Sequence, residues 1–96
     1  MYARLVTFKL GPGKRSEAEK LLGTFDPKIR ARNGFKSLTF LGDDAIGEYG
    51  GLMVYESEAD AEAAFEALYP QLGKALTGIA QGPPNNHLYE VLEAAA

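Results

Sequence analysis

The chain has 96 residues, of which 46% are hydrophobic and 24% are charged, values typical of one small globular domain that we expect to span residues 1–96. The formal net charge of −3 argues against a nucleic-acid partner, because nucleic acids are bound through an excess of Lys and Arg. Zero cysteines exclude a disulfide, a thiol nucleophile and a Cys-ligated metal site, and they fit the cytoplasmic location that we expect.

The N-terminal segment predicts a β-strand over residues 2–10 with apolar side chains on both faces. One face holds Arg4, Val6, Phe8 and Leu10, and the other holds Ala3, Leu5, Thr7 and Lys9. Arg4 and Lys9 interrupt the apolar run, so it lacks the uninterrupted apolar core of a signal peptide. No stretch approaches the length of a membrane span, and we expect no membrane partner.

A helix is predicted to follow the Gly-Pro-Gly turn of residues 11–13. Ser16 and Glu19 have the spacing of a capping box, and apolar residues at helical intervals follow them. The Asp-Pro pair at 26–27 is expected to interrupt this helix, and the Asn-Gly pair at 33–34 is expected to end it.

Two further strands are predicted, at residues 35–42 and at about 46–56, joined by a turn-like link that makes them a hairpin. Gly50 and Gly51 indicate a bulge or the close approach of another backbone. The consecutive apolar residues at 52–54 must point to both faces of the sheet, because successive side chains of a strand alternate. Both faces of this strand therefore need a cover.

A second helix is predicted to begin after Ser57, whose side chain can cap its first turn. Pro70 is expected to stop or kink it, a short third helix is predicted over 72–79, and a last strand over 87–93. Three glutamates of the second helix share the side that we expect to face water: Glu58, Glu62 and Glu66.

The predicted order is therefore β-α-β-β-α-β, the ferredoxin-like arrangement of an α+β protein, with a four-stranded antiparallel sheet and helices on one face. The opposite face of the first and third predicted strands would leave a large apolar patch in water. A second copy of the same sheet is the simplest cover, so we expect a homodimer that packs sheet to sheet.

The sequence resembles the antibiotic-biosynthesis monooxygenase-like family of the dimeric α+β barrel superfamily. The resemblance rests on three segments of the chain: LVTFKLGPGKRSEAEKLL, NGFKSLTFL and VYESEADAEAAFEAL. In the family, the last segment typically begins with an aromatic residue, usually Trp, followed by a Ser or Thr cap and an acidic start to the helix. Tyr55, Ser57 and Glu58 stand at those positions here. The resemblance implies the same dimeric barrel.

The resemblance also implies a ligand held between the helices and the sheet. Some members oxidise phenolic polycyclic or quinol-like substrates with O₂ and no cofactor, whereas relatives bind and degrade haem. The haem-degrading relatives use an Asn on the first strand, near where Val6 falls, and a His on the second helix, and neither is present here. We therefore expect no haem degradation and no haem, flavin or metal cofactor.

Two residues are candidates for catalysis. His87, the sole histidine, could act as a general base because imidazole titrates near neutral pH. The alternative is a strand-edge histidine bonded to a loop carbonyl or to water. Arg4 could hold a substrate carboxylate or enolate, and the alternative is an ion pair with an acid on a helix.

The remaining candidates are expected to bind the substrate. Val6, Phe8, Phe65 and Leu68 would form the walls of the pocket. Tyr55 and Tyr89 could donate hydrogen bonds to an oxygenated ring or could serve packing alone. Tyr69 could close the mouth of the pocket or simply end a helix. No metal-ligand spacing occurs, and residues 11–16 lack the spacing of a nucleotide-binding loop.

The sequence thus predicts a cofactor-independent, monooxygenase-like protein that acts on a small aromatic or quinol-type molecule. Two alternatives stay open. One is a dimer that binds a small molecule without turnover, and the other is a structural dimeric barrel whose pocket is filled by its own side chains.

Overall fold

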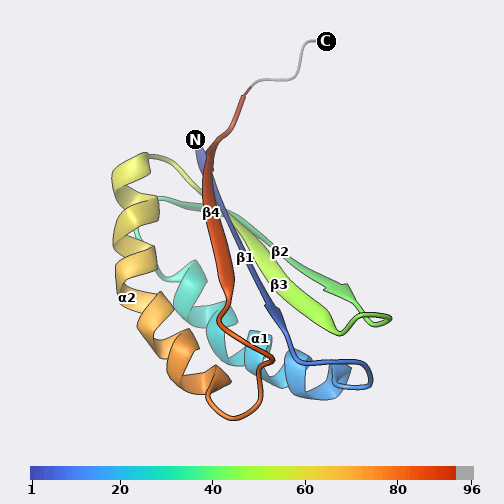
Figure 1. The fold of residues 1–96 in the computed structure, drawn as a ribbon. Coiled ribbons are helices and arrows are strands. Elements are labelled where there is room, and N and C mark those ends of the chain that lie inside the picture. Colours follow the sequence, from blue (N-terminus) through green and yellow to red (C-terminus); the bar gives the residue numbers. More distant parts are fainter. Residues whose placement is uncertain (93–96) are drawn as a thin grey trace.

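The computed structural model of the chain describes residues 1–92 and has the predicted β-α-β-β-α-β order (Figure 1). The elements are β1 Tyr2–Lys9, α1 Arg15–Arg30, β2 Phe35–Asp43, β3 Glu48–Tyr55, α2 Glu58–Leu76 and β4 Asn85–Glu90. The strands form one antiparallel sheet in the order β2-β3-β1-β4, and both helices cover the same face of it. The ferredoxin-like fold predicted from the sequence is confirmed.

The register of the sheet decides which side chains face the helices. Arg4 lies opposite Leu88, whereas Leu5 lies opposite both Leu52 and His87. Directly paired residues of an antiparallel sheet point to the same face. Leu88 packs against the core, so Arg4 also faces the helices, while Leu5 and its two partners face away from them.

The hydrophobic core lies between the sheet and the two helices, in two groups of buried side chains. One group contains Val6, Phe25, Ile29, Met53, Tyr55, Ala61 and Ala64. The other contains Phe8, Leu10, Ala18, Tyr49 and Leu76. Val6, Phe8 and Leu10, predicted to share one face of the first strand, thus all lie on the side that the helices cover.

The opposite face of the sheet, called the outer face below, is covered by no helix or strand of residues 1–92 (Figure 1). The register places these side chains on it: Ala3, Leu5, Thr7, Thr39, Leu41, Leu52, Val54, His87 and Tyr89. Tyr89 is 51% exposed and Leu41 is 43% exposed in the single chain. The consecutive apolar residues of β3 thus do point to both faces, as predicted.

Helix α1 differs from its prediction at both ends and in its middle. It begins at Arg15 and Lys14 is its N-cap, so Ser16 lies inside the helix and the predicted capping box is wrong. Pro27 does not interrupt α1, because Phe25 and Ile29 on either side of it are buried in the core and hold the helical path. The helix ends at Arg30, before the predicted Asn-Gly pair.

Helix α2 begins as predicted and ends later. The Ser57 side chain accepts a hydrogen bond from the backbone N–H of Asp60 at 3.1 Å, which confirms the cap. The helix continues through Pro70 to Leu76, so the separate third helix is wrong. Leu76 is buried against the group around Phe8, and this packing keeps the segment after the proline helical.

The β2–β3 hairpin is confirmed. Gly50 of β3 lies so close to the backbone of the neighbouring strand β1 that only a glycine fits there. A Cβ built on Gly50 would lie 2.0 Å from the backbone oxygen of Val6, so the prediction of a close backbone approach is correct. The bulge lies elsewhere, between Phe35 and Ser37 of β2.

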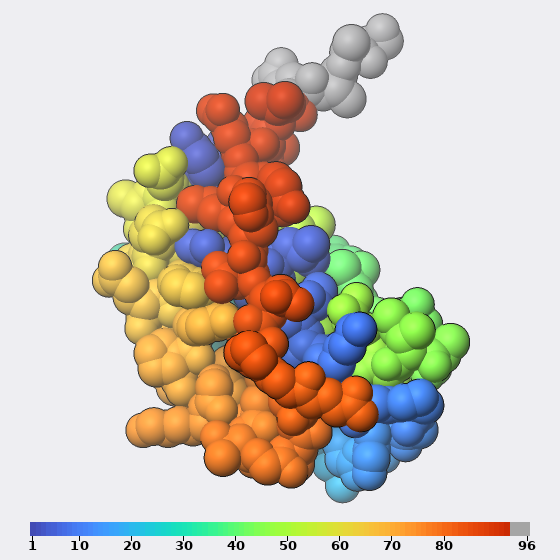
Figure 2. All heavy atoms as spheres, viewed as in Figure 1, coloured from blue at the N-terminus to red at the C-terminus, as the bar shows by residue number. Residues whose placement is uncertain are grey.

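Strand β4 begins at Asn85, earlier than predicted, and Glu93 of the predicted strand lies outside the described residues. Figure 2 shows the loop that precedes β4 lying against the C-terminal part of α2, where the Tyr69 hydroxyl donates a hydrogen bond to the backbone oxygen of Pro84 at 3.1 Å. Neither helix of the described chain combines the length and the apolar composition needed to cross a membrane.

Candidate functional site

A cavity of about 70 Å³, partly open to solvent, lies between the two helices and the helix-facing side of the sheet. It contacts β1, β2, β3, α1 and α2, so every layer of the fold contributes to it. Arg4 is the one charged residue among those that line it, and the others are apolar, aromatic or glycine. Seven residues predicted from the sequence line this cavity: Arg4, Val6, Phe8, Tyr55, Phe65, Leu68 and Tyr69.

Small residues of α2 and β3 create the space. Ala61 and Ala64 of α2 are 1% and 3% exposed and face the sheet, and Gly51 of β3 lies across from them in the cavity wall. None of these side chains extends beyond Cβ, so the helix and the sheet leave a gap that neighbouring side chains do not fill. A protein interior is otherwise packed with few voids larger than a water molecule.

Arg4 supplies the charge of the cavity and is itself buried, with a side chain 9% exposed. Its Nη2 donates to Oε1 of Glu62 at 2.9 Å, and its Nη1 donates to Oδ1 of Asn86 at 3.2 Å. Its Nε is buried and has no hydrogen-bond partner in the described chain. The predicted alternative for Arg4, an ion pair with a helix acid, is therefore present, while its buried Nε–H has no acceptor among the described residues.

A column of stacked side chains extends from Arg4 along α2. The Arg4 Cζ lies 4.2 Å from the centroid of the Phe65 ring, which gives a cation–π contact. The Phe65 ring in turn stacks on the Tyr69 ring, with centroids 4.4 Å apart and planes inclined by 27°. The bond from Tyr69 to Pro84 ties the end of this column to the loop before β4.

Tyr55 contributes a phenol to the wall of the cavity. The residue is 2% exposed, and its ring packs edge to face against Phe35 at a centroid distance of 6.3 Å. Burial raises the pKa of the Tyr55 hydroxyl, and the positive charges of Arg32 and Arg4 oppose part of this rise. The side chain is therefore a neutral phenol at neutral pH and can act as a hydrogen-bond donor.

His87 and Tyr89, both predicted from the sequence as site residues, do not line the cavity, so the structure does not bring them together with Arg4. Both lie on the outer face, opposite Leu5 and Ala3 of β1, with their rings 4.4 Å apart. The physical reason is the register of β4 against β1. This register turns Asn86 and Leu88 toward the helices, so the alternate residues His87 and Tyr89 point to the outer face. The sheet thus separates the sole histidine from Arg4.

Glu62 and Asn86 are residues of this site that the sequence prediction missed. Glu62 was expected to face water with Glu58 and Glu66, and its side chain is indeed 49% exposed, yet its carboxylate reaches Arg4. The only signal in the sequence was the buried cation itself, because a guanidinium on the core side of a strand needs an acceptor.

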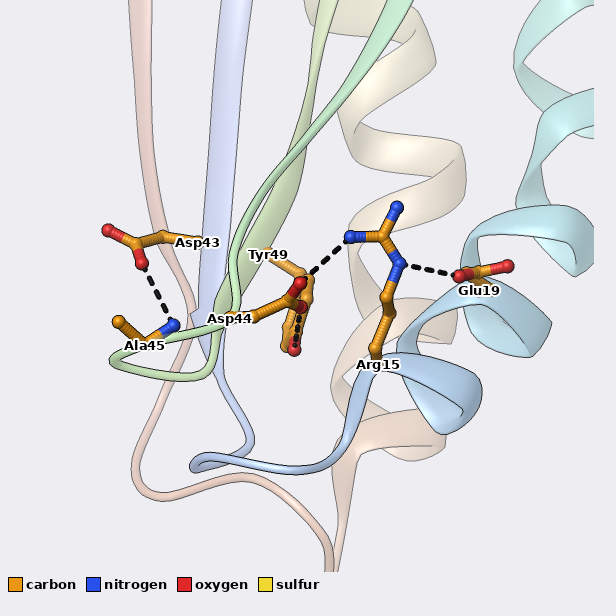
Figure 3. Close-up of polar contacts among 6 residues, drawn as sticks. All are labelled: Arg15, Glu19, Asp43, Asp44, Ala45 and Tyr49. Carbon is orange, nitrogen blue, oxygen red and sulfur yellow. Dashed lines mark hydrogen bonds and ion pairs between the residues drawn. The ribbon is translucent and has the colours of Figure 1, made fainter.

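A second polar cluster lies outside the cavity and joins α1 to the β2–β3 hairpin (Figure 3). Arg15 donates to Glu19 at 2.8 Å and to Asp44 at 2.9 Å, and the Tyr49 hydroxyl donates to Asp44 at 2.8 Å. The bonds from Tyr49 and then Arg15 hold the pKa of Asp44 below its usual range. This arrangement fixes the hairpin against the helix.

No metal site accompanies either cluster in residues 1–92, where no three acidic or histidine side chains are grouped to hold an ion. The polar groups of the cavity lining are the Arg4 guanidinium and the phenols of Tyr55 and Tyr69, and Glu62 and Asn86 contact Arg4 from outside the lining. Such groups can bind an oxygenated aromatic molecule and stabilise negative charge on it.

Solved structures with the same fold include several described as monooxygenases. A monooxygenase from the gene ActVA-Orf6 of Streptomyces coelicolor, in complex with nanaomycin D, has a TM-score of 0.78 at 25% identity, covering 99% of this chain and 90% of that one. SnoaB, a cofactor-independent oxygenase from Streptomyces nogalater in its N63A mutant, has a TM-score of 0.77 at 17% identity, covering 97% and 94%.

A Deinococcus radiodurans protein described as an antibiotic biosynthesis monooxygenase has a TM-score of 0.82 at 15% identity, with 100% of this chain and 97% of that one covered. These similarities confirm the resemblance to antibiotic-biosynthesis monooxygenases at the level of the fold. No protein-family model and no curated protein matches the sequence.

Proposed function

We propose that this protein binds a small, flat aromatic or quinol-type molecule in the cavity between the helices and the sheet and oxidises it with O₂ without a cofactor. The fold is that of proteins described as monooxygenases, one of them as a cofactor-independent oxygenase and another in complex with nanaomycin D. The observation that carries the proposal is the apolar cavity with a single charged side chain at its wall.

The chemistry of such a reaction requires little of the protein. A substrate that has lost a proton is electron-rich, and its anion gives electrons to O₂ directly. When a ring CH₂ becomes C=O, one oxygen atom of O₂ enters the carbonyl and the other leaves as water, so the substrate supplies all the electrons. The protein needs to hold the ring and to favour the anion over the neutral form.

The residues of the cavity fit these two tasks. Val6, Phe8, Phe65 and Leu68 provide apolar walls for a flat ring. Arg4 would face the developing negative charge, with Tyr55 and Tyr69 as phenols near the ring. His87 and Tyr89 have no role at this site, because they lie on the opposite face of the sheet.

The size of the cavity favours a second candidate function. Its volume of about 70 Å³ is well below the roughly 300–1,000 Å³ typical of pockets that hold drug-sized ligands, so a ring system must displace side chains to enter. If these side chains do not yield, the protein is a structural dimeric barrel without a ligand.

The outer face supports the proposal of a homodimer. Its apolar side chains lie on all four strands, and a second copy packed face to face would remove them from water. Burying such side chains contributes about 1.5–3 kcal/mol each. The cavity lies on the other side of the sheet, so each subunit would keep its own site.

The test is oxygen uptake with anthrone and 1,4-naphthoquinol, after subtraction of their spontaneous oxidation. Leu68→Trp would fill the cavity, whereas Ala63→Trp places the same side chain at an exposed position of α2. We expect uptake above the background in the wild type and in Ala63→Trp, and its loss in Leu68→Trp. Equal rates in all three proteins, or no uptake in any, would contradict the proposed function.

A further inference from the structure

We infer that Glu62 occupies the place of a ligand's anionic group at Arg4, so that the cavity selects flat aromatic molecules that carry a carboxylate or a comparable anionic oxygen. This inference rests on the proposed function, because it takes the cavity as the ligand site. To that function it adds the charge of the ligand. It also assigns to Glu62 a role in specificity, because Glu62 competes with the ligand's anionic group for Arg4.

The first step concerns the cation. The guanidinium of Arg4 does not lose its proton in proteins, and its side chain is only 9% exposed. A buried charge of this kind needs an anion beside it. Among the described residues, the carboxylate that meets this need is that of Glu62, at 2.9 Å from Nη2, since the other acceptor, Asn86, is a neutral amide.

The second step concerns the donors of Arg4. The Nε–H and one Nη2–H of a guanidinium point in the same direction, so a single carboxylate can bridge them with two bonds. Glu62 bonds Nη2 through Oε1, while Nε is buried without a partner. Of these two parallel donors, only Nη2–H is therefore bonded, and a ligand oxygen that reaches Nε would bond the other.

The third step concerns the mobility of the present partner. Glu62 belongs to the solvent-facing side of α2 and its side chain is 49% exposed, in contrast to Arg4. The Glu62 carboxylate is already half exposed to water, so it gains solvation when it turns away, provided that another anion takes its place at Arg4. When a ligand anion replaces it, Arg4 stays paired and the net charge beside the buried guanidinium does not change.

The fourth step places the rest of the ligand. Phe65 stacks on one side of the Arg4 guanidinium and also lines the cavity with Tyr69. An anionic group bonded to Arg4 would therefore direct its ring system along this column and into the apolar lining. Neutral aromatic molecules can use the lining but gain nothing from the exchange with Glu62.

The experiment compares two probes of nearly the same shape, 2-naphthoate and the neutral 2-naphthamide, by isothermal titration calorimetry. The proteins are the wild type, Glu62→Gln and the control Glu66→Gln, a residue one turn further along α2 that forms no ion pair in the described chain. We expect Glu62→Gln to bind naphthoate about threefold more tightly than the wild type, since the competing carboxylate of Glu62 is half exposed and is displaced at small cost.

Naphthamide should bind with the same affinity to all three proteins, and Glu66→Gln should behave as the wild type with both probes. Naphthoate affinity that is unchanged or weaker in Glu62→Gln, while naphthamide still binds, would overturn the inference and leave the proposed ligand site intact. Failure of both probes to bind the wild type would overturn the ligand site itself, and the inference with it.

Discussion

Leu5 and His87 lie directly opposite each other across β1 and β4, on the face of the sheet that points away from both helices. The sole histidine of the chain is therefore separated from the Arg4 cavity by the sheet. We therefore assign the polar end of the proposed site to Arg4 with its partners Glu62 and Asn86, and not to the imidazole of His87.

The substitution His87→Ala is expected to leave naphthamide binding and oxygen uptake unchanged, because no atom of His87 lines the cavity. Calorimetry and an oxygen electrode provide the two measurements. Phe65→Ala serves as the positive control, since it removes a ring that does line the cavity. Loss of binding in His87→Ala with a retained fold would restore the histidine to the site.

The substitution Leu52→Asp is expected to yield monomers that remain folded, whereas Met53→Asp should unfold the domain. The two residues are neighbours in β3, but Leu52 faces outward opposite Leu5, and Met53 is 9% exposed within the core. An unpaired charge buried in a dry interface or core costs several kcal/mol. Light scattering and circular dichroism distinguish the outcomes. A wild type with the mass of one chain at micromolar concentration would contradict the dimer.

The Asp44 cluster predicts a pH dependence of stability. The pKa of Asp44 is held low in the folded state by Tyr49 and Arg15, so its stabilising effect is present above the pKa of the unfolded chain. That effect is lost as the pH falls through the lower, folded pKa. In Tyr49→Phe, the first of these causes is removed, and NMR titration should show the pKa of Asp44 closer to its usual range. An unchanged pKa would argue that Arg15 alone sets it.

Gly50→Ala is expected to lower the free energy of unfolding by about 1–3 kcal/mol, because the new Cβ would overlap the Val6 carbonyl oxygen. Gly73→Ala is the matched control. It lies inside α2 with open space where a Cβ would stand, so the same change should raise stability by about 0.5–1 kcal/mol. Urea denaturation measures both, and equal effects of the two substitutions would contradict the close approach.

Ser57→Ala is expected to cost about 1 kcal/mol, because Ser57 caps α2 through the N–H of Asp60. Ser16→Ala should be neutral or slightly stabilising, since Ser16 lies within α1 and caps nothing. Thermal denaturation of both variants tests the two assignments. A comparable loss in Ser16→Ala would show that the capping box predicted from the sequence does form.

The sequence predicted the fold well because alternation within a strand is local information. The parity of β1 places Val6 and Phe8 on the core side without any knowledge of the neighbouring strands. The face of His87 was not predictable in this way. It depends on how β4 aligns with β1, and a shift of one residue would turn every side chain of β4 to the other face.

The errors in the helices have a different origin. Local preferences predicted an interruption at Pro27 and a stop or a kink at Pro70, but buried residues beyond them, Ile29 and Leu76, keep both helices continuous. Glu62 was missed because helical spacing describes where a side chain starts, and a glutamate is long enough to reach around the helix to Arg4.

These two prolines also affect the mechanics of the layer above the cavity. A proline cannot donate to the carbonyl four residues earlier, so α1 loses one rung of its hydrogen-bond ladder at Pro27 and α2 loses one at Pro70. Residues beside both gaps, Ile29 and Tyr69, line the cavity. Bending costs least where a rung is missing. If a ligand enlarges this space of about 70 Å³, we therefore expect the helices to bend at Pro27 and Pro70.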